Sequence, residues 1–185
     1  MKNKIIILTI AILTGSVLYG QNNDKKSVTD VLLSAVSERA YTTVPVTDQQ
    51  LDIILKSGIK SPSSSNRQPW KFTVIRDETS VKEIINDAVA GNVLIVISGA
   101  DTPNGPDRFD AGLTTEAMFI AAHGLGLGAR IYGSPVKTVT SNRDQYQIPA
   151  GFTPVMVLRV GNVNVDAVSS ASPRKTFDEV VNFKK

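Results

Sequence analysis

The chain has 185 residues, of which 42% are hydrophobic and 20% charged, with a formal net charge of +3 and no cysteine. This length and apolar content are typical of one compact domain rather than two. The lack of cysteine excludes a disulfide framework, a Cys-ligated metal centre and a cysteine nucleophile. The small net charge, without a basic patch interleaved with aromatic residues, argues against a nucleic-acid partner.

Residues 1–20 have the layout of a secretory signal peptide. Lysines stand at positions 2 and 4, an apolar run covers 5–13, and small or polar residues precede Gln21. The apolar run is shorter than the roughly 20 residues that a transmembrane helix needs, although an uncleaved N-terminal anchor is an alternative. We expect cleavage after Gly20 and export to the periplasm or the medium, with no stable membrane anchor afterwards. A polar leader over 21–26 would then precede one domain over 27–185.

Two amphipathic helices open this domain. Apolar residues recur at helical spacing over 27–37, and Ser27 with Asp30 forms a capping-box pattern, so we expect a helix that ends near Glu38. Thr47 and Gln50 repeat the pattern at the start of a second helix, which runs to about residue 59.

The rest of the chain alternates between strand and helix patterns. Apolar and polar residues alternate over 70–76, and an amphipathic pattern follows over 79–90. The continuous apolar run over 93–98 is typical of a strand covered on both faces of the sheet. In chain order, the patterns predict a strand over 70–76, a helix over 79–90, a strand over 93–98, a helix over 110–125, a strand over 129–132, a short helix after Pro135, a strand over 153–161 and a C-terminal arm over 162–185. This order is typical of an α+β domain.

The segment between the second helix and the first strand, Lys60–Trp70, is rich in small hydroxylic residues. Pro62 and Pro69 fix their own φ angles and stiffen both ends of this loop. An ordinary helix-to-strand connection has a similar composition. The order is more specific, because Pro-Ser-Ser-x-Asn-x-Gln-Pro-Trp from Pro62 to Trp70 closely resembles the signature loop of the FMN-dependent nitroreductase family.

The resemblance extends from about Ser37 to Phe183 and implies a nitroreductase-like α+β fold. In that fold a central, mixed but mainly antiparallel sheet is flanked by helices. The resemblance also implies bound FMN and a homodimer with the flavin at the subunit interface. By position, the implied cofactor contacts are Ser37, Arg39, Pro62, Ser63, Ser64, Asn66, Tyr132, Gly133 and Arg174.

Two of these contacts belong to a motif that this chain carries only in part. The family's Arg-Arg-Ser-x-Arg resembles residues 35–39, where Ser37 and Arg39 match but Ala35 and Val36 replace two arginines. Losing one charge-assisted phosphate contact would cost about 1.5 to 3 kcal/mol. Arg174, which matches the family's late basic motif, would supply a compensating cation.

Two further features follow from the resemblance. The backbone at Tyr132 and Gly133 would pass beside the flavin ring, with an amide aimed at N5. The second feature is a departure: only sixteen residues separate Arg76 from Val93, where family members commonly carry a longer helical excursion that helps cover the site. We therefore expect a more open pocket here.

Other chemistries find little support in the sequence. The glycines at 124, 126 and 128 follow a helix and precede a strand, whereas the dinucleotide fingerprint needs the reverse order. His123 is the only histidine, so we expect a packing or capping role and neither a zinc site nor a Ser-His-Asp triad. Asp107, Asp110 and Glu116 are interpreted as acids that favour the start of a helix.

The resemblance implies an FMN-dependent oxidoreductase that reduces a small acceptor such as a nitroaromatic or a quinone. NAD(P)H would be the hydride donor, the transfer would run through flavin N5 in a ping-pong scheme, and no catalytic side chain is required. One alternative is an exported protein of this fold that has lost redox turnover and acts as a ligand-binding or scaffold module. A second alternative keeps the flavin but performs reductive dehalogenation or oxygen-dependent chemistry.

Overall fold

The computed structural model describes residues 27–167 and 169–184. The predicted signal peptide over 1–20 and the polar leader over 21–26 lie outside the described residues. The elements are α1 (Val28–Ser34), α2 (Asp48–Ile59), the 3-10 turn η1 (Ser64–Asn66), β1 (Trp70–Ile75), α3 (Glu78–Ile84), β2 (Val93–Thr102), β3 (Gly105–Pro106), α4 (Phe109–Gly124), β4 (Leu127–Tyr132), α5 (Val136–Ser141), β5 (Phe152–Asn162) and α6 (Phe177–Val180).

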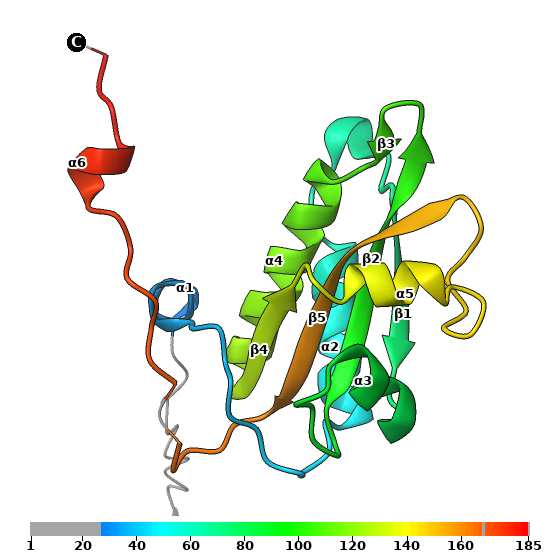
Figure 1. The fold of residues 1–185 in the computed structure, drawn as a ribbon. Coiled ribbons are helices and arrows are strands. Elements are labelled where there is room, and N and C mark those ends of the chain that lie inside the picture. Colours follow the sequence, from blue (N-terminus) through cyan, green and yellow to red (C-terminus); the bar gives the residue numbers. More distant parts are fainter. Residues whose placement is uncertain (1–26, 168, 185) are drawn as a thin grey trace, which may run out of the picture.

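A five-stranded sheet forms the centre of the domain, with the order β1-β2-β5-β4 and β3 paired to β2 (Figure 1). All pairs between named strands are antiparallel. Ser37 adds a parallel bridge to Ala129 of β4, so the sheet is mixed but mainly antiparallel, as predicted. The apolar run at the start of β2 is wholly buried between β1 and β5, which confirms its central place.

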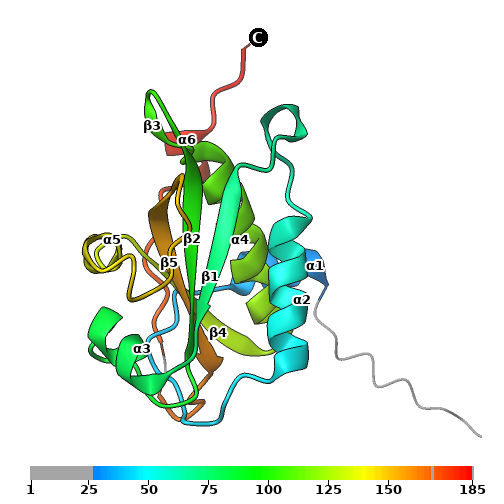
Figure 2. The same ribbon diagram turned by 90° about the vertical axis from the view of Figure 1, so that its right-hand side faces the viewer.

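Helices cover both faces of the sheet, with α2 and α4 on one face and α3 and α5 on the other (Figure 2). Ile54 of α2 and Met118 of α4 belong to the larger apolar cluster beneath the first face. Val81 of α3 and Val139 of α5 belong to a second cluster beneath the other. Burial of each such side chain contributes about 1.5 to 3 kcal/mol, so the two clusters hold the layers together.

Helices α2 and α4 are closely packed, and the loop Lys60–Trp70 follows α2 directly. Thr114 Oγ1 donates a 2.7 Å hydrogen bond to the carbonyl oxygen of Gly58. A Cβ atom at Gly58 would lie 2.8 Å from Met118 Cγ, so glycine is needed for this approach. The loop that leaves α2 therefore starts from a point fixed against the middle of α4.

The helix starts follow the prediction, but two helix ends do not. The Ser27–Asp30 and Thr47–Gln50 capping boxes are both present. The first helix ends at Ser34 instead of near Glu38, because the following residues turn extended and pair with β4. The third helix ends at Ile84 instead of residue 90, because Ile85 is extended and buried in the core.

The C-terminal arm leaves the body of the domain after β5, and α6 lies well away from the sheet (Figure 1). Phe177, Val180 and Phe183 on this arm are each more than 60% exposed. Within the described part of the chain, no helix combines the length and the apolar character needed to cross a membrane.

Candidate functional site

The loop from Pro62 to Pro69 folds back on itself through short-range hydrogen bonds. Ser63 Oγ accepts a 2.9 Å bond from the amide of Gln68. Ser65, Asn66 and Gln68 have φ angles of 53°, 53° and 50°, in the left-handed region that non-glycine residues rarely adopt. Such conformations persist only where the surroundings hold them, and they cluster at ligand-binding segments.

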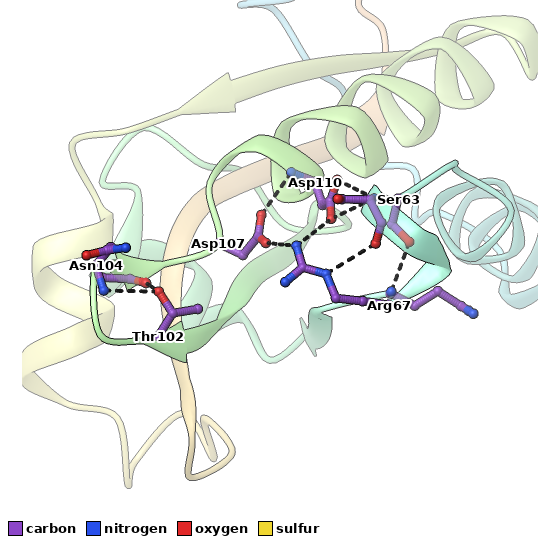
Figure 3. A network of polar contacts seen from close by, with 9 residues as sticks. Ser63, Arg67, Thr102, Asn104, Asp107 and Asp110 are labelled. Atoms are coloured by element: carbon purple, nitrogen blue, oxygen red, sulfur yellow. Dashed lines mark hydrogen bonds and ion pairs between the residues drawn. The ribbon is translucent and has the colours of Figure 1, made fainter.

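A buried carboxylate at the start of α4 fixes this loop conformation (Figure 3). The amide of Ser64 donates to both carboxylate oxygens of Asp110 at 3.1 Å, and Asp110 is only 1% exposed. Arg67 Nη2 lies 3.4 Å from Asp107 Oδ2 and 4.0 Å from Asp110 Oδ2. Asp107 in turn accepts a 3.0 Å bond from the amide of Asp110.

The two aspartates therefore do more than favour the start of a helix, which was the interpretation from sequence. They anchor the signature loop to α4, and Arg67 joins the loop to both of them. The amide of Ser64 is engaged by Asp110, so any ligand contact from Ser64 would come from its side chain. Ser63, Ser64 and Asn66 remain close together at the surface of this loop.

A second group of predicted residues lies around a cavity of about 330 Å³ beside the middle of α4. Ser37 reaches it from the segment after α1, and Arg174 reaches it from the C-terminal arm. The lining residues are Leu32, Ala35, Ser37, Glu116, Phe119, Ile120, Ile131 and Arg174. The structure thus unites two predicted contacts from opposite ends of the described chain.

Pro62 lines a different cavity, of about 640 Å³, between α2 and α4. The two groups are offset along α4, because Ser64 binds Asp110 in the first turn, whereas the first α4 residue that lines the Ser37–Arg174 cavity is Glu116. At about 1.5 Å per residue these positions are roughly 9 Å apart along the helix. No residue of the loop over 62–69 lines the Ser37–Arg174 cavity of the same chain.

Glu38 fixes the backbone that carries Ser37 and Arg39. Its carboxylate is buried and accepts bonds from the amides of Arg39 at 2.7 Å and Ala40 at 2.9 Å, and from the hydroxyl of Ser169. Burial raises the pKa of Glu38, but these hydrogen bonds outweigh burial and hold the pKa below its usual value. The side chain of Arg39 is exposed and does not line the cavity.

At the end of β4, neighbouring side chains point to opposite faces of the sheet. Ile131 lines the Ser37–Arg174 cavity, whereas Tyr132 packs against the cluster beneath α3 and α5. The Tyr132 hydroxyl lies 3.4 Å from Arg159 Nη1. The side chain of Tyr132 is therefore directed away from the cavity, and Gly133 follows at the exposed end of the strand.

Arg159 of β5 was missed by reasoning from the sequence. It is 1% exposed, and its Nε donates to Asn92 Oδ1 at 2.9 Å. Its Nη1 lies 3.2 Å from Asp87 Oδ1, and its Nη2 donates to the Asp87 carbonyl oxygen at 3.1 Å. The available signal was a single charge inside the apolar run 155–160.

Three other expectations can be compared with the structure. Residues 124–128 end α4 and lead into β4, which confirms that this glycine series is not a dinucleotide fingerprint. The ring of His123 packs against that of Phe119 with centroids 4.6 Å apart, as expected for a packing residue. The short 77–92 segment forms α3 on the opposite face of the sheet, so it does not cover the Ser37–Arg174 cavity.

Comparisons with known proteins agree with this architecture. A family profile described as the Nitroreductase family matches residues 32–101. A protein of Archaeoglobus fulgidus, described as a candidate NADH dehydrogenase/NAD(P)H nitroreductase, is 29% identical over 103 residues. That match covers 50% of this chain and 59% of the relative, so the chain spans less than two thirds of that relative's length.

Solved structures extend the likeness over most of the chain. A candidate nitroreductase of Desulfovibrio desulfuricans, solved in complex with FMN, is 26% identical with a TM-score of 0.72, and the match covers 86% of this chain and 98% of the other. A nitroreductase of Bacteroides fragilis with bound FMN has a TM-score of 0.73 at 16% identity, covering 86% and 100% of the two chains, and shows the fold alone. The chain therefore has a nitroreductase-like α+β fold, and its residues 32–101 match the profile of the Nitroreductase family.

Proposed function

We propose that this chain binds FMN and uses it to reduce a small acceptor, such as a nitroaromatic or a quinone, with NAD(P)H as the electron donor in a ping-pong scheme. The observation that carries the proposal is the meeting of Ser37 and Arg174 in one cavity. Both were singled out from separate stretches of sequence as contacts of the same cofactor. The FMN-bound relative and the names of the NAD(P)H-using relatives support the proposal.

The residues of the cavity fit part of a flavin nucleotide. Leu32, Phe119 and Ile131 provide an apolar wall on one part of a lining that is mainly polar, and Ser37 and Arg174 provide a hydroxyl and a guanidinium. Polar groups of this kind fix the orientation of a small ligand in its site. A guanidinium is also well suited to a phosphate, because its planar N–H groups can bind two oxygens at once.

In this proposal bound FMN supplies hydride transfer, and the chain supplies binding and orientation. Arg174 and Ser37 hold the anionic end of the ligand. Phe119 and Ile131 exclude water from its apolar part, and the backbone at Tyr132–Gly133 borders it. We assign no acid or base role to any side chain.

We further propose that the complete site requires a homodimer. The signature loop and the Ser37–Arg174 cavity lie apart in one protomer, so a second copy is needed to bring the loop of one protomer to the cavity of the other. The exposed apolar residues of the arm, Phe177, Val180 and Phe183, would be covered by such a partner. Their exposure supports the dimer but does not identify the surface that covers them.

The proposed reaction is tested by anaerobic reduction of the FMN-loaded protein with NADH and, separately, NADPH. Bleaching of the flavin by one donor, followed by recovery on addition of a nitroaromatic or a quinone without remaining donor, is the expected result. Acceptor screening also separates this function from dehalogenation and oxygen-dependent chemistry. Flavin that is bound but reduced by neither donor would contradict the proposed donor.

A second candidate is a ligand-binding or scaffold module without redox turnover. The observation that favours it is that Ala35, and not an arginine, lines the cavity together with Glu116. This candidate predicts a folded protein that retains no FMN. Flavin content after desalting separates the two functions before any assay of turnover.

We also propose export, with cleavage after Gly20, on the sequence pattern of residues 1–20. Mass spectrometry of the protein from the native host tests it. A mature N-terminus at or near Gln21 in the periplasmic or secreted fraction is expected. An intact N-terminus on protein in the cytoplasm would contradict it.

A further inference from the structure

The Ser37–Arg174 cavity carries one positive and one negative side chain. Arg174 comes from the arm and Glu116 from α4, and the other lining residues are uncharged. Ala35 lines the cavity at a position where the resemblance implies an arginine. The formal charge of the residues that line the cavity in one protomer is therefore zero.

Glu116 is held toward this cavity by the helix that carries it. Phe119 and Ile120, three and four residues later, line the same cavity, because residues at these spacings share a helix face. Glu116 is exposed, whereas the preceding residue, Thr115, is buried and donates a 2.7 Å bond to the Ala111 carbonyl oxygen. In the described part of the chain, no lysine or arginine forms an ion pair with Glu116.

The charge of Glu116 bears on which flavin the cavity prefers. A phosphomonoester carries about −1.5 to −2 charges at pH 7. Arg174 attracts this group, but Glu116 repels it, and among the described residues of one protomer no second cation lines the cavity. The isoalloxazine ring is uncharged in its oxidised form, so the apolar wall serves the phosphorylated and the unphosphorylated flavin alike.

We propose that Glu116 is a specificity-determining residue that removes most of the preference for the phosphate, so that the cavity accepts riboflavin nearly as well as FMN. The inference rests on the proposed flavin site and deepens it. Specificity of this kind is a difference of affinities, and an opposing charge is a common way to set it. Ala35 contributes by leaving the phosphate without a second cation.

Titration of the full chain with FMN and with riboflavin, followed by flavin fluorescence, tests the proposal. We expect the two dissociation constants to lie within about tenfold of each other. Glu116→Gln should tighten FMN about three- to tenfold and leave riboflavin unchanged. Ala35→Arg should tighten FMN in the same direction, whereas the control Glu78→Gln, on the opposite face of the sheet, should change neither constant.

The results of these titrations distinguish failure of this inference from failure of the proposed FMN-binding function. FMN binding more than about a hundredfold tighter than riboflavin, or a Glu116→Gln variant with an unchanged ratio, would overturn the inference and leave the FMN site standing. Binding of neither flavin would overturn the proposed function and this inference together. Comparable binding of both flavins, with a selective gain for FMN in Glu116→Gln, is the result that supports it.

Discussion

The guanidinium of Arg159 lies 4.1 Å from the centre of the Tyr41 ring, inside the domain. The two residues join the segment after α1 to β5, and hydrogen bonds extend the contact to Asp87 and Asn92 in the turn before β2. Burial raises the pKa of Tyr41, and the nearby Arg159 opposes that rise. This cluster holds together segments that are far apart in the sequence.

Arg159→Met should destabilise the domain by about 2 to 3 kcal/mol, because several charge-assisted hydrogen bonds and the ring contact are lost together. The loss is limited because Asp87 is 60% exposed and water can solvate it. Urea unfolding of the variant and the parent measures the difference. Lys82→Ala, which removes an exposed ion pair with Glu78, is the matched control and should cost less than about 0.5 kcal/mol. Equal effects of the two variants would show that the buried cluster is not a stabilising element.

Asp110→Ala should release the signature loop from α4. The amide of Ser64 would lose its acceptor and Arg67 would lose part of its pairing, at a cost of about 2 to 3 kcal/mol. Limited trypsin digestion with mass spectrometry should then show faster cleavage after Arg67. Asp52→Ala, which removes a surface ion pair on α2, is the control and should leave that rate unchanged. Cleavage after Arg67 at the parent rate in Asp110→Ala would argue against the anchor.

Glu38 should make part of the stability depend on acid pH. Its pKa in the folded protein is below its ordinary value of 4.5, so the folded state favours the charged carboxylate. The stabilisation is complete above that ordinary value and is lost as the pH falls through the lowered folded-state pKa. Glu38→Gln should therefore be less stable at pH 7 and lose less further stability on acidification, as measured by urea unfolding across this range. Parallel stability curves for the two proteins would contradict the assignment.

Arg174→Ala should weaken FMN binding about ten- to a hundredfold while leaving the urea midpoint close to that of the parent. Arg174 is exposed on the arm, and its Nη1 bonds only to the Ser172 carbonyl oxygen at 2.8 Å among the described residues, so the fold depends little on it. Arg39 does not line the cavity, so Arg39→Ala should weaken FMN retention less than Arg174→Ala. Lys175→Ala is the control for loss of a neighbouring positive charge. FMN retention by Arg174→Ala equal to that of the parent would remove Arg174 from the site.

The sequence predicted most clearly those features that depend on neighbours in the chain. Both capping boxes place a helix start, since the interacting side chain and amide are three residues apart. The predicted end of the first helix was wrong, because the true end depends on pairing between Ser37 and Ala129, which no local pattern reveals. The central strand was placed correctly because its apolar run is continuous.

The candidate site was predicted as a set of residues but not as an arrangement. The resemblance orders contacts along the chain, whereas the structure places Ser37 with Arg174 and leaves Ser64 beside Asp110. The roles of Asp110 and Arg159 depend on partners 46 and 67 residues away, respectively. Such roles cannot be derived from composition or spacing.

The proposed function depends most directly on whether the protein holds a flavin. The visible absorption spectrum of the purified chain, taken before and after incubation with FMN and desalting, measures this. We predict a flavin band that persists after desalting, at a level near one flavin for each Ser37–Arg174 cavity. A folded protein that stays colourless after the same treatment would contradict the FMN site and favour a binding role without redox turnover.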